Sequence, residues 1–297
     1  VTTIMIMFCY SVVTGWALKY FVASVTTGTP DNPAAYWAAY SVSVWQPILF
    51  HIVAILAGTT IVARGVVGGI ERVNKVLIPA LFTLLLVAVG RAVTLDGADR
   101  GLAFLFSPDL SALLSYRTWL EALTQSAWST GAGWGLILAY AVYVKRDEDV
   151  VVNSAVIALG NNTASLLAAM AILPTVFAIL STSDALDVMA AGNLGLTFVW
   201  IPQLFLQIPS GTVVLPIFFL ALFFASLSSL IAMIELASRV LIDAGLSRRI
   251  AVRLVGAATT ICGVPSAISP AIFENQDWVW SLALMISGLF ISVAVTR

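Results

Sequence analysis

Long apolar stretches, separated by short polar ones, run through the chain from its first residues to its last. A helix that crosses a bilayer needs about 20 mainly apolar residues, and in lipid it must satisfy its backbone hydrogen bonds internally. The pattern therefore predicts an all-α, polytopic membrane protein with eight transmembrane helices in a single transmembrane domain, residues 1–297. The predicted helices cover residues 3–25, 43–63, 74–94, 117–144, 150–181, 211–241, 250–271 and 278–296.

The composition agrees with this interpretation. Of the 297 residues, 60% are apolar and 10% are charged, whereas a soluble domain carries about 25% charged residues. A net charge of −1 gives no basic surface for nucleic acid. The two cysteines and the single histidine, His51, lie in apolar stretches and are expected to be packed side chains. We therefore expect no metal framework and no enzyme, and no filter of repeated coordinating groups indicates a channel.

Basic residues gather in the even-numbered loops between the predicted helices. By the positive-inside rule these loops are cytoplasmic, which places the first residue on the cytoplasmic side of the plasma membrane. The fifth loop, residues 182–210, is semi-apolar and is expected to form a short helical hairpin on the extracellular face. Both chain ends fall inside apolar stretches, so we expect a segment that is truncated at both ends. Ten of the fourteen basic residues lie on the cytoplasmic side: Arg64, Arg72, Lys75, Lys145, Arg146, Arg239, Arg248, Arg249, Arg253 and Arg297.

The fourth predicted span contains the most informative segment. Residues 129–135, Ser-Thr-Gly-Ala-Gly-Trp-Gly, place three glycines in its middle. Each glycine costs about 1 kcal/mol relative to alanine inside a helix, so the cluster predicts a break. A break in a membrane helix frees carbonyl groups for cations and helix ends for a substrate. Close helix packing through small residues is the alternative interpretation.

Hydroxyl groups on a later helix suggest a cation site. Ala225, Ser228 and Ser229 share one helix face, where two hydroxyls can offer oxygen atoms to sodium. Serine in membrane helices also bonds back to its own chain, which is the alternative. Near the cytoplasmic end of the same span, Glu235 lies one turn from Arg239, and an ion pair between these two is expected.

Polar side chains within two other spans have no obvious role in lipid. Asn161 and Ser165 share a face in the fifth span, and Tyr10 lies deep in the first. Tyrosine is typical of the membrane surface, and buried amides are costly unless they are paired. These residues indicate either a binding site or hydrogen bonds between helices.

In their order along the chain, these segments resemble the neurotransmitter:sodium symporter family, which has a leucine-transporter-like, broken-helix inverted-repeat fold. The resemblance covers the whole chain, as the family's helices three to ten. It implies symport of an amino acid with sodium ions by alternating access, in a bilayer, and leaves a homodimer open. It also implies that the family's first helix, which supplies half of each sodium site, is absent. The motifs are YSVVTGW (10–16), RGVVGGIER (64–72), QSAWSTGAGWG (125–135), NNTAS (161–165) and ASLSS (225–229).

The resemblance implies roles for individual residues. The hydroxyl of Tyr10 would bind the substrate carboxylate, Trp128 would be the aromatic lid, and Asp277 would be the acidic half of an extracellular gate. The first sodium site would include Ser129 and Asn161, and the second would include Ala225, Ser228 and Ser229. The substrate would contact Ile6, Tyr10, Val13, Trp128, Ser129, Gly131, Trp134, Ser229 and Met233.

Two departures from the family pattern bear on the anion and the substrate. A neutral set, like the chloride-binding set of the animal members, favours chloride as a coupled anion, although Glu121 could supply the negative charge instead. Trp128, Trp134 and Met233 are bulky, which favours a small neutral amino acid such as glycine or alanine. A sodium-coupled symporter of another small osmolyte or amine is the alternative. The neutral set is Gln125, Ser129, Asn161 and Ser165.

Overall fold

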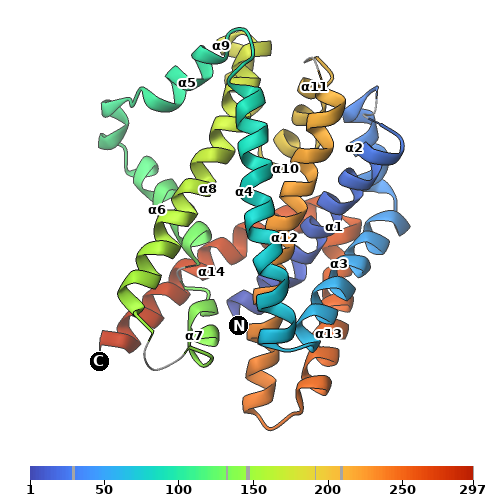
Figure 1. Ribbon diagram of the computed structural model, residues 1–297, viewed down its shortest axis with the longest axis vertical. Helices are drawn as coiled ribbons and strands as arrows, with labels where there is room; N and C mark the ends of the chain where they lie inside the picture. The colour runs from blue at the N-terminus through green and yellow to red at the C-terminus, as the bar shows by residue number, and fades with distance from the viewer. Residues whose placement is uncertain (29–30, 132, 145–147, 191, 208–209, 297) are drawn as a thin grey trace.

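The computed structural model describes residues 1–28, 31–131, 133–144, 148–190, 192–207 and 210–296, and every regular element within these ranges is helical (Figure 1). Seven helices are long and apolar enough to cross a membrane. The prediction of an all-α polytopic protein is therefore confirmed. The seven are α1 (Thr2–Thr26), α3 (Trp45–Ala63), α4 (Arg72–Ala92, continuing a π-helical turn, η1, Val66–Glu71), α8 (Val150–Ile179), α12 (Gly211–Asp243), α13 (Arg248–Ile268) and α14 (Pro270–Thr296).

The remaining predicted span is divided between two shorter helices, α6 (Tyr116–Thr130) and α7 (Leu136–Ala141). One boundary also differs from the prediction, because α14 begins before the polar residues 274–277 rather than after them. Its first residue is Pro270, and proline at a helix start gives up only an N–H group that would have no partner within the helix.

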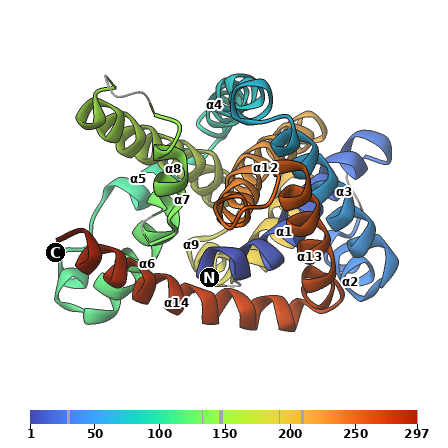
Figure 2. The ribbon, with the colours of Figure 1, turned by 90° about the horizontal axis from the view of Figure 1, so that it is seen from below.

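The centre of the bundle is α12, which packs along α1, with α3, α4 and α13 around this pair (Figures 1 and 2). Ile6 of α1 and Leu230 and Met233 of α12 are at most 1% exposed. Lipid tails are as apolar as these side chains, so association rests mainly on close packing between helices.

Small residues permit that packing. A Cβ atom added to Gly15 of α1 would lie 2.7 Å from the backbone nitrogen of His51 in α3. The His51 side chain is fully buried, with its ring between the Ser11 hydroxyl at 3.2 Å and the Thr260 carbonyl oxygen at 3.3 Å. The histidine is therefore a packed residue that joins three helices, as the sequence suggested.

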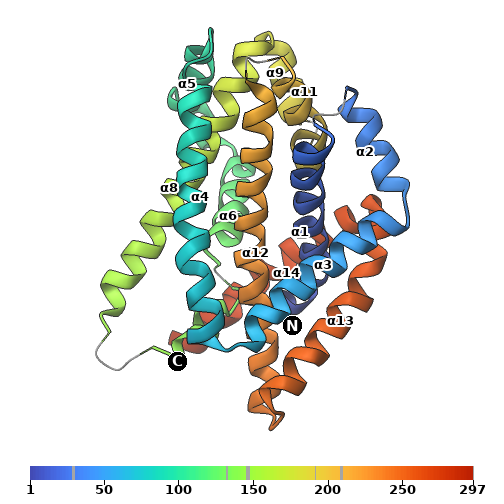
Figure 3. The same cartoon turned by 45° about the vertical axis from the view of Figure 1, so that its right-hand side comes forward.

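Short helices cover one end of the bundle (Figures 1 and 3). The predicted hairpin is helical, as expected, with its residues 191, 208 and 209 outside the described part. Phe198 in this segment is 1% exposed, with its ring stacked 5.0 Å from that of Trp37 and edge-on to Trp16. The covering elements include α2 (Pro33–Val42), α9 (Thr182–Ala190), α10 (Gly192–Gly195), η3 (Leu196–Trp200) and α11 (Ile201–Phe205).

The opposite end carries the turns that follow α3 and α12 (Figures 1 and 3). These are even-numbered loops, so the grouping that the basic residues predicted is found in the fold. Lys145, Arg146 and Arg297 lie outside the described residues.

At this end the predicted ion pair between Glu235 and Arg239 is wrong. The fully buried carboxylate of Glu235 accepts hydrogen bonds from Arg248 of α13 at 2.5 and 3.2 Å and from the Tyr143 hydroxyl at 2.8 Å. Arg239 instead pairs with Asp243, at 2.7 Å. Arg248 is favoured because the turn after α12 returns it to that helix, where its planar guanidinium binds both carboxylate oxygens.

Candidate functional site

The predicted break in the fourth span is present and is made by glycines. Helix α6 ends at Thr130, and α7 begins at Leu136. Between them, Gly131, Gly133 and Gly135 have φ angles of +75°, +81° and +75°. Residues with a Cβ atom rarely adopt this left-handed conformation, so the glycine cluster and the break have one cause.

Hydroxyl groups from two other helices satisfy carbonyl groups that the break releases. Ser287 of α14 donates to the Gly133 carbonyl at 2.7 Å, and Thr3 of α1 donates to the Trp134 carbonyl at 2.5 Å. Irregular backbone at membrane depth requires such partners. The sequence did not single out Thr3 or Ser287, because only the packing of distant helices brings them to the break.

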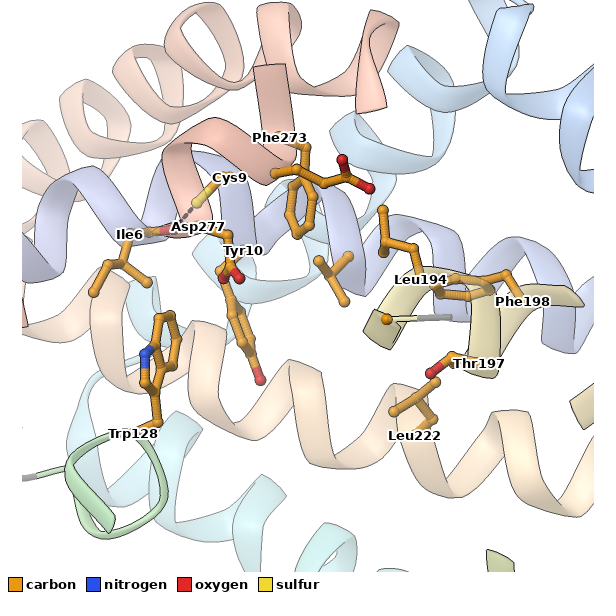
Figure 4. Close-up of a pocket in the computed structure, with 13 residues that line it drawn as sticks. Ile6, Cys9, Tyr10, Trp128, Leu194, Thr197, Phe198, Leu222, Phe273 and Asp277 are labelled. Carbon is orange, nitrogen blue, oxygen red and sulfur yellow. Dashed lines mark hydrogen bonds between the residues drawn. The ribbon is translucent and has the colours of Figure 1, made fainter. Parts of the chain in front are cut away.

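Two cavities meet beside the break. The outer cavity, about 370 Å³, lies among α1, α14 and the hairpin segment, and Figure 4 shows its side chains. The inner cavity, about 280 Å³, lies against α7 and α12. Tyr10 and Trp128 line both cavities. These two aromatic side chains therefore form the partition between the cavities.

Most of the expected substrate residues line the inner cavity. Ile6 and Val13 do not, and they line the outer cavity instead. They share a face of α1 with Tyr10, whose longer side chain lines both cavities (Figure 4), the inner one together with Ser229 of α12. That all nine contact a substrate stays a prediction. The seven in the inner cavity are Tyr10, Trp128, Ser129, Gly131, Trp134, Ser229 and Met233.

Two indole rings narrow the inner cavity. Trp128 and Trp134 meet edge to face, with ring centroids 5.1 Å apart and planes at 78°. The indole N–H of Trp134 donates to the Ala127 carbonyl at 3.3 Å, which links the two sides of the break. Gly131 leaves room opposite, since a Cβ atom there would meet no atom within 4 Å.

The residues expected at the first sodium site lie together. The Ser129 hydroxyl is 2.9 Å from Oδ1 and 2.7 Å from Nδ2 of Asn161. This contact joins the end of α6 to the middle of α8. It places one hydroxyl and one amide oxygen, both ligands suited to a hard cation, at the edge of the break.

Two of the three residues expected at the second sodium site face a groove. Ser228 and Ser229 line it together with Leu136 and Tyr140 of α7. Both hydroxyls donate to the Ala225 carbonyl, at 2.8 and 3.2 Å. The alternative of bonding back to the helix is thus realised. It is compatible with a cation site, because each oxygen retains lone pairs once its proton is directed to the helix.

The expected chloride-binding residues are only partly assembled. Gln125 and Ser129 line a further cavity of about 480 Å³, whereas Ser165 is exposed. Glu121, the alternative source of negative charge, points away from this site, with Oε1 2.8 Å from Nε of Arg117 and a side chain that is 66% exposed.

Acidic groups lie at the outer cavity. Asp277 and Glu274 of α14 both line it, opposite the hairpin residues Leu194, Thr197 and Phe198 (Figure 4). The sequence identified Asp277 but not the hairpin residues. The semi-apolar character of the fifth loop indicated that the loop is partly buried. It did not indicate which helices the loop packs against.

The chain is similar to sodium-dependent transporters. The profile of the "Sodium:neurotransmitter symporter family" matches residues 40–295. An uncharacterized sodium-dependent transporter of Methanocaldococcus jannaschii is 32% identical over 79% of this chain and 50% of its own length. A sodium- and chloride-dependent GABA transporter of Drosophila melanogaster is 29% identical over 66% of this chain and 22% of its own. The chain thus spans half of the first relative and less of the second.

A solved structure shares the fold. The crystal structure of MhsT in complex with L-phenylalanine matches with a TM-score of 0.86 and 31% sequence identity, over 98% of this chain and 69% of the MhsT chain. The arrangement of the helices in this chain is therefore that of the MhsT structure.

Proposed function

Because the chain belongs to the sodium:neurotransmitter symporter family, we propose that the protein couples sodium entry to the uptake of a small neutral amino acid across the plasma membrane. The observation that supports this most directly is the inner cavity at the break, which has hydroxyl and amide oxygens suited to a cation on two sides. The end that carries the turns after α3 and α12 would face the cytoplasm.

The lining of the inner cavity supports a neutral substrate. Among its described residues none is charged, so a charged side chain on the substrate would have no partner there. The Tyr10 hydroxyl is placed to bind a carboxylate, and the carbonyl end of α6 carries the partial negative charge that suits an ammonium group. Trp128 and Trp134 limit the volume, which favours glycine or alanine.

Alternating access would use the break as its moving part. The broken helix would rock against a scaffold that includes α1, α3 and α12, opening the inner cavity first to one side and then to the other. Sodium would supply the driving force, since each ion that enters down about 100 mV gains about 2.3 kcal/mol.

Uptake of tritiated alanine into proteoliposomes tests this function, with the complete gene product and an inward sodium gradient. We expect accumulation that stops when choline replaces sodium outside. Unlabelled glycine should compete, whereas L-phenylalanine and a quaternary-amine osmolyte should compete weakly. Equal uptake with and without sodium would contradict the proposal, and strong competition by the osmolyte would favour the alternative substrate class.

The first mutational prediction concerns Ser228 and Ser229, the two serines that line the groove. Ser228→Ala or Ser229→Ala should raise the half-saturating sodium concentration about tenfold, since one contact to a charged group contributes about 1.5 kcal/mol. Ser226→Ala is the matched control, because Ser226 also bonds back to its helix, at 3.0 Å from the Phe223 carbonyl, but is buried away from the groove. A similar sodium dependence in all three variants would remove the second sodium site from the proposal.

Chloride coupling gives a second prediction. Replacing chloride with gluconate should lower uptake about tenfold, equivalent to about 1.4 kcal/mol, because the neutral groups around Ser129 and Asn161 leave sodium without a balancing charge. Glu121→Gln should leave uptake unchanged, since that carboxylate pairs with Arg117. Full uptake in gluconate would contradict chloride coupling, and a large loss in the Glu121 variant would assign the balancing charge to that residue.

A further inference from the structure

Trp128, one of the two aromatic side chains between the cavities, is hydrogen-bonded to α14. The Trp128 indole N–H donates a hydrogen bond to the Ser281 hydroxyl oxygen at 2.9 Å. The Ser281 hydroxyl in turn donates to the Asp277 carbonyl oxygen, one helical turn earlier, at 2.6 Å. The direction of the first bond is fixed, because an indole can only donate and the serine proton is already committed to the helix.

This hydrogen bond determines where the indole can lie. Trp128 packs edge to face on Trp134 on one side and is held by Ser281 on the other. Without the Ser281 oxygen, the N–H would have to find another partner in the polar space that Gln125 and Asp277 also line, and the ring would lose the orientation that this bond defines. The bond also joins α6, which ends at the break, to the helix that carries Asp277 at the outer cavity.

We propose that Ser281 is a positioning residue for the lid: its hydroxyl holds the Trp128 indole across the passage between the outer and inner cavities. This inference rests on the proposed transport function. A ligand in the inner cavity cannot return to the outer cavity until the indole leaves Ser281. The strength of this one bond therefore contributes to the time for which substrate stays enclosed.

The test uses the complete gene product in nanodiscs, with tritiated alanine as the probe in saturating sodium. Ser281→Ala and Trp128→Phe should each increase the dissociation rate of alanine about two- to tenfold, the effect of one neutral hydrogen bond. The double variant should be no faster than either single variant, because both remove the same bond. Ser281→Thr, which keeps a hydroxyl, should restore the wild-type rate.

Two control variants separate this role from a general loss of structure. Trp119→Phe removes another indole N–H from α6, one that donates to the Leu113 carbonyl at 2.8 Å on the exposed side. Ser154→Ala removes a hydroxyl that bonds back to Val150 in α8 at 2.7 Å. Both variants should dissociate alanine at the wild-type rate.

A second readout needs no substrate, so it also decides the matter if alanine does not bind. Met233→Cys places a thiol in the inner cavity, in a background in which every native cysteine, Cys9 and Cys262 included, is replaced by serine. Ser281→Ala should speed its labelling by a membrane-impermeant thiol reagent from the outer side about two- to tenfold. Unchanged labelling would overturn the lid proposal, whereas absent alanine binding in the wild type would count only against the proposed substrate.

Discussion

Replacing Arg248 with methionine should lower the free energy of unfolding by about 3–5 kcal/mol, the cost of removing one partner from a buried ion pair. Its partner Glu235 is fully buried and would retain only the Tyr143 hydroxyl. The guanidinium also donates to the Val62 carbonyl at the end of α3, at 2.9 and 3.1 Å. The substitution therefore releases the start of α13 from two helices at once.

Thermal unfolding of the purified protein in detergent measures this effect. Arg117→Met is the matched control, because Arg117 pairs with Glu121 at the same kind of distance, 2.8 Å, with both side chains mainly exposed. That change should cost less than about 1 kcal/mol. A Glu235→Met, Arg248→Met double variant should recover much of the loss, since it leaves no unpaired charge. If Arg248→Met is no worse than Arg117→Met, the pair does not stabilise the fold.

The same pair shows where reasoning from sequence stops. Spacing along one helix suggested Arg239 as the partner of Glu235, since residues four apart are neighbours on a helix surface. In the structure Arg239 pairs with Asp243, which lies four residues after it, whereas Glu235 lies four residues before it. Sequence spacing identifies possible ion-pair partners within one helix. It does not reveal a partner on the next helix, and the turn after α12 brings Arg248 of α13 to Glu235.

Features that depend on local sequence were predictable. Apolar length located the spans, and the three glycines located the break, because both follow from the chemistry of consecutive residues. The division of α1 between two cavities was not predictable. Ile6, Tyr10 and Val13 share a face, and only the positions of α12, α14 and the hairpin decide which cavity each one meets.

Gly133→Ala is expected to have the second large effect, lowering the free energy of unfolding by about 2–5 kcal/mol and abolishing sodium-driven uptake. Two costs combine at this position. Its φ of +81° disfavours any side chain, and an added Cβ atom would lie 2.6 Å from the Leu284 carbonyl oxygen and 2.8 Å from the Gly288 nitrogen. Both atoms belong to the backbone of α14, which cannot yield as a flexible side chain does.

Gly131→Ala separates the two costs. Gly131 has nearly the same φ, +75°, but a Cβ atom there meets nothing within 4 Å. Its substitution should therefore cost only the conformational part, about 1–2 kcal/mol. The difference between the two variants, measured by thermal unfolding and by uptake, isolates the contact between the break and α14. Equal losses would mean that the break requires glycine for its backbone conformation alone, and that the close approach of α14 at Gly133 does not contribute to stability.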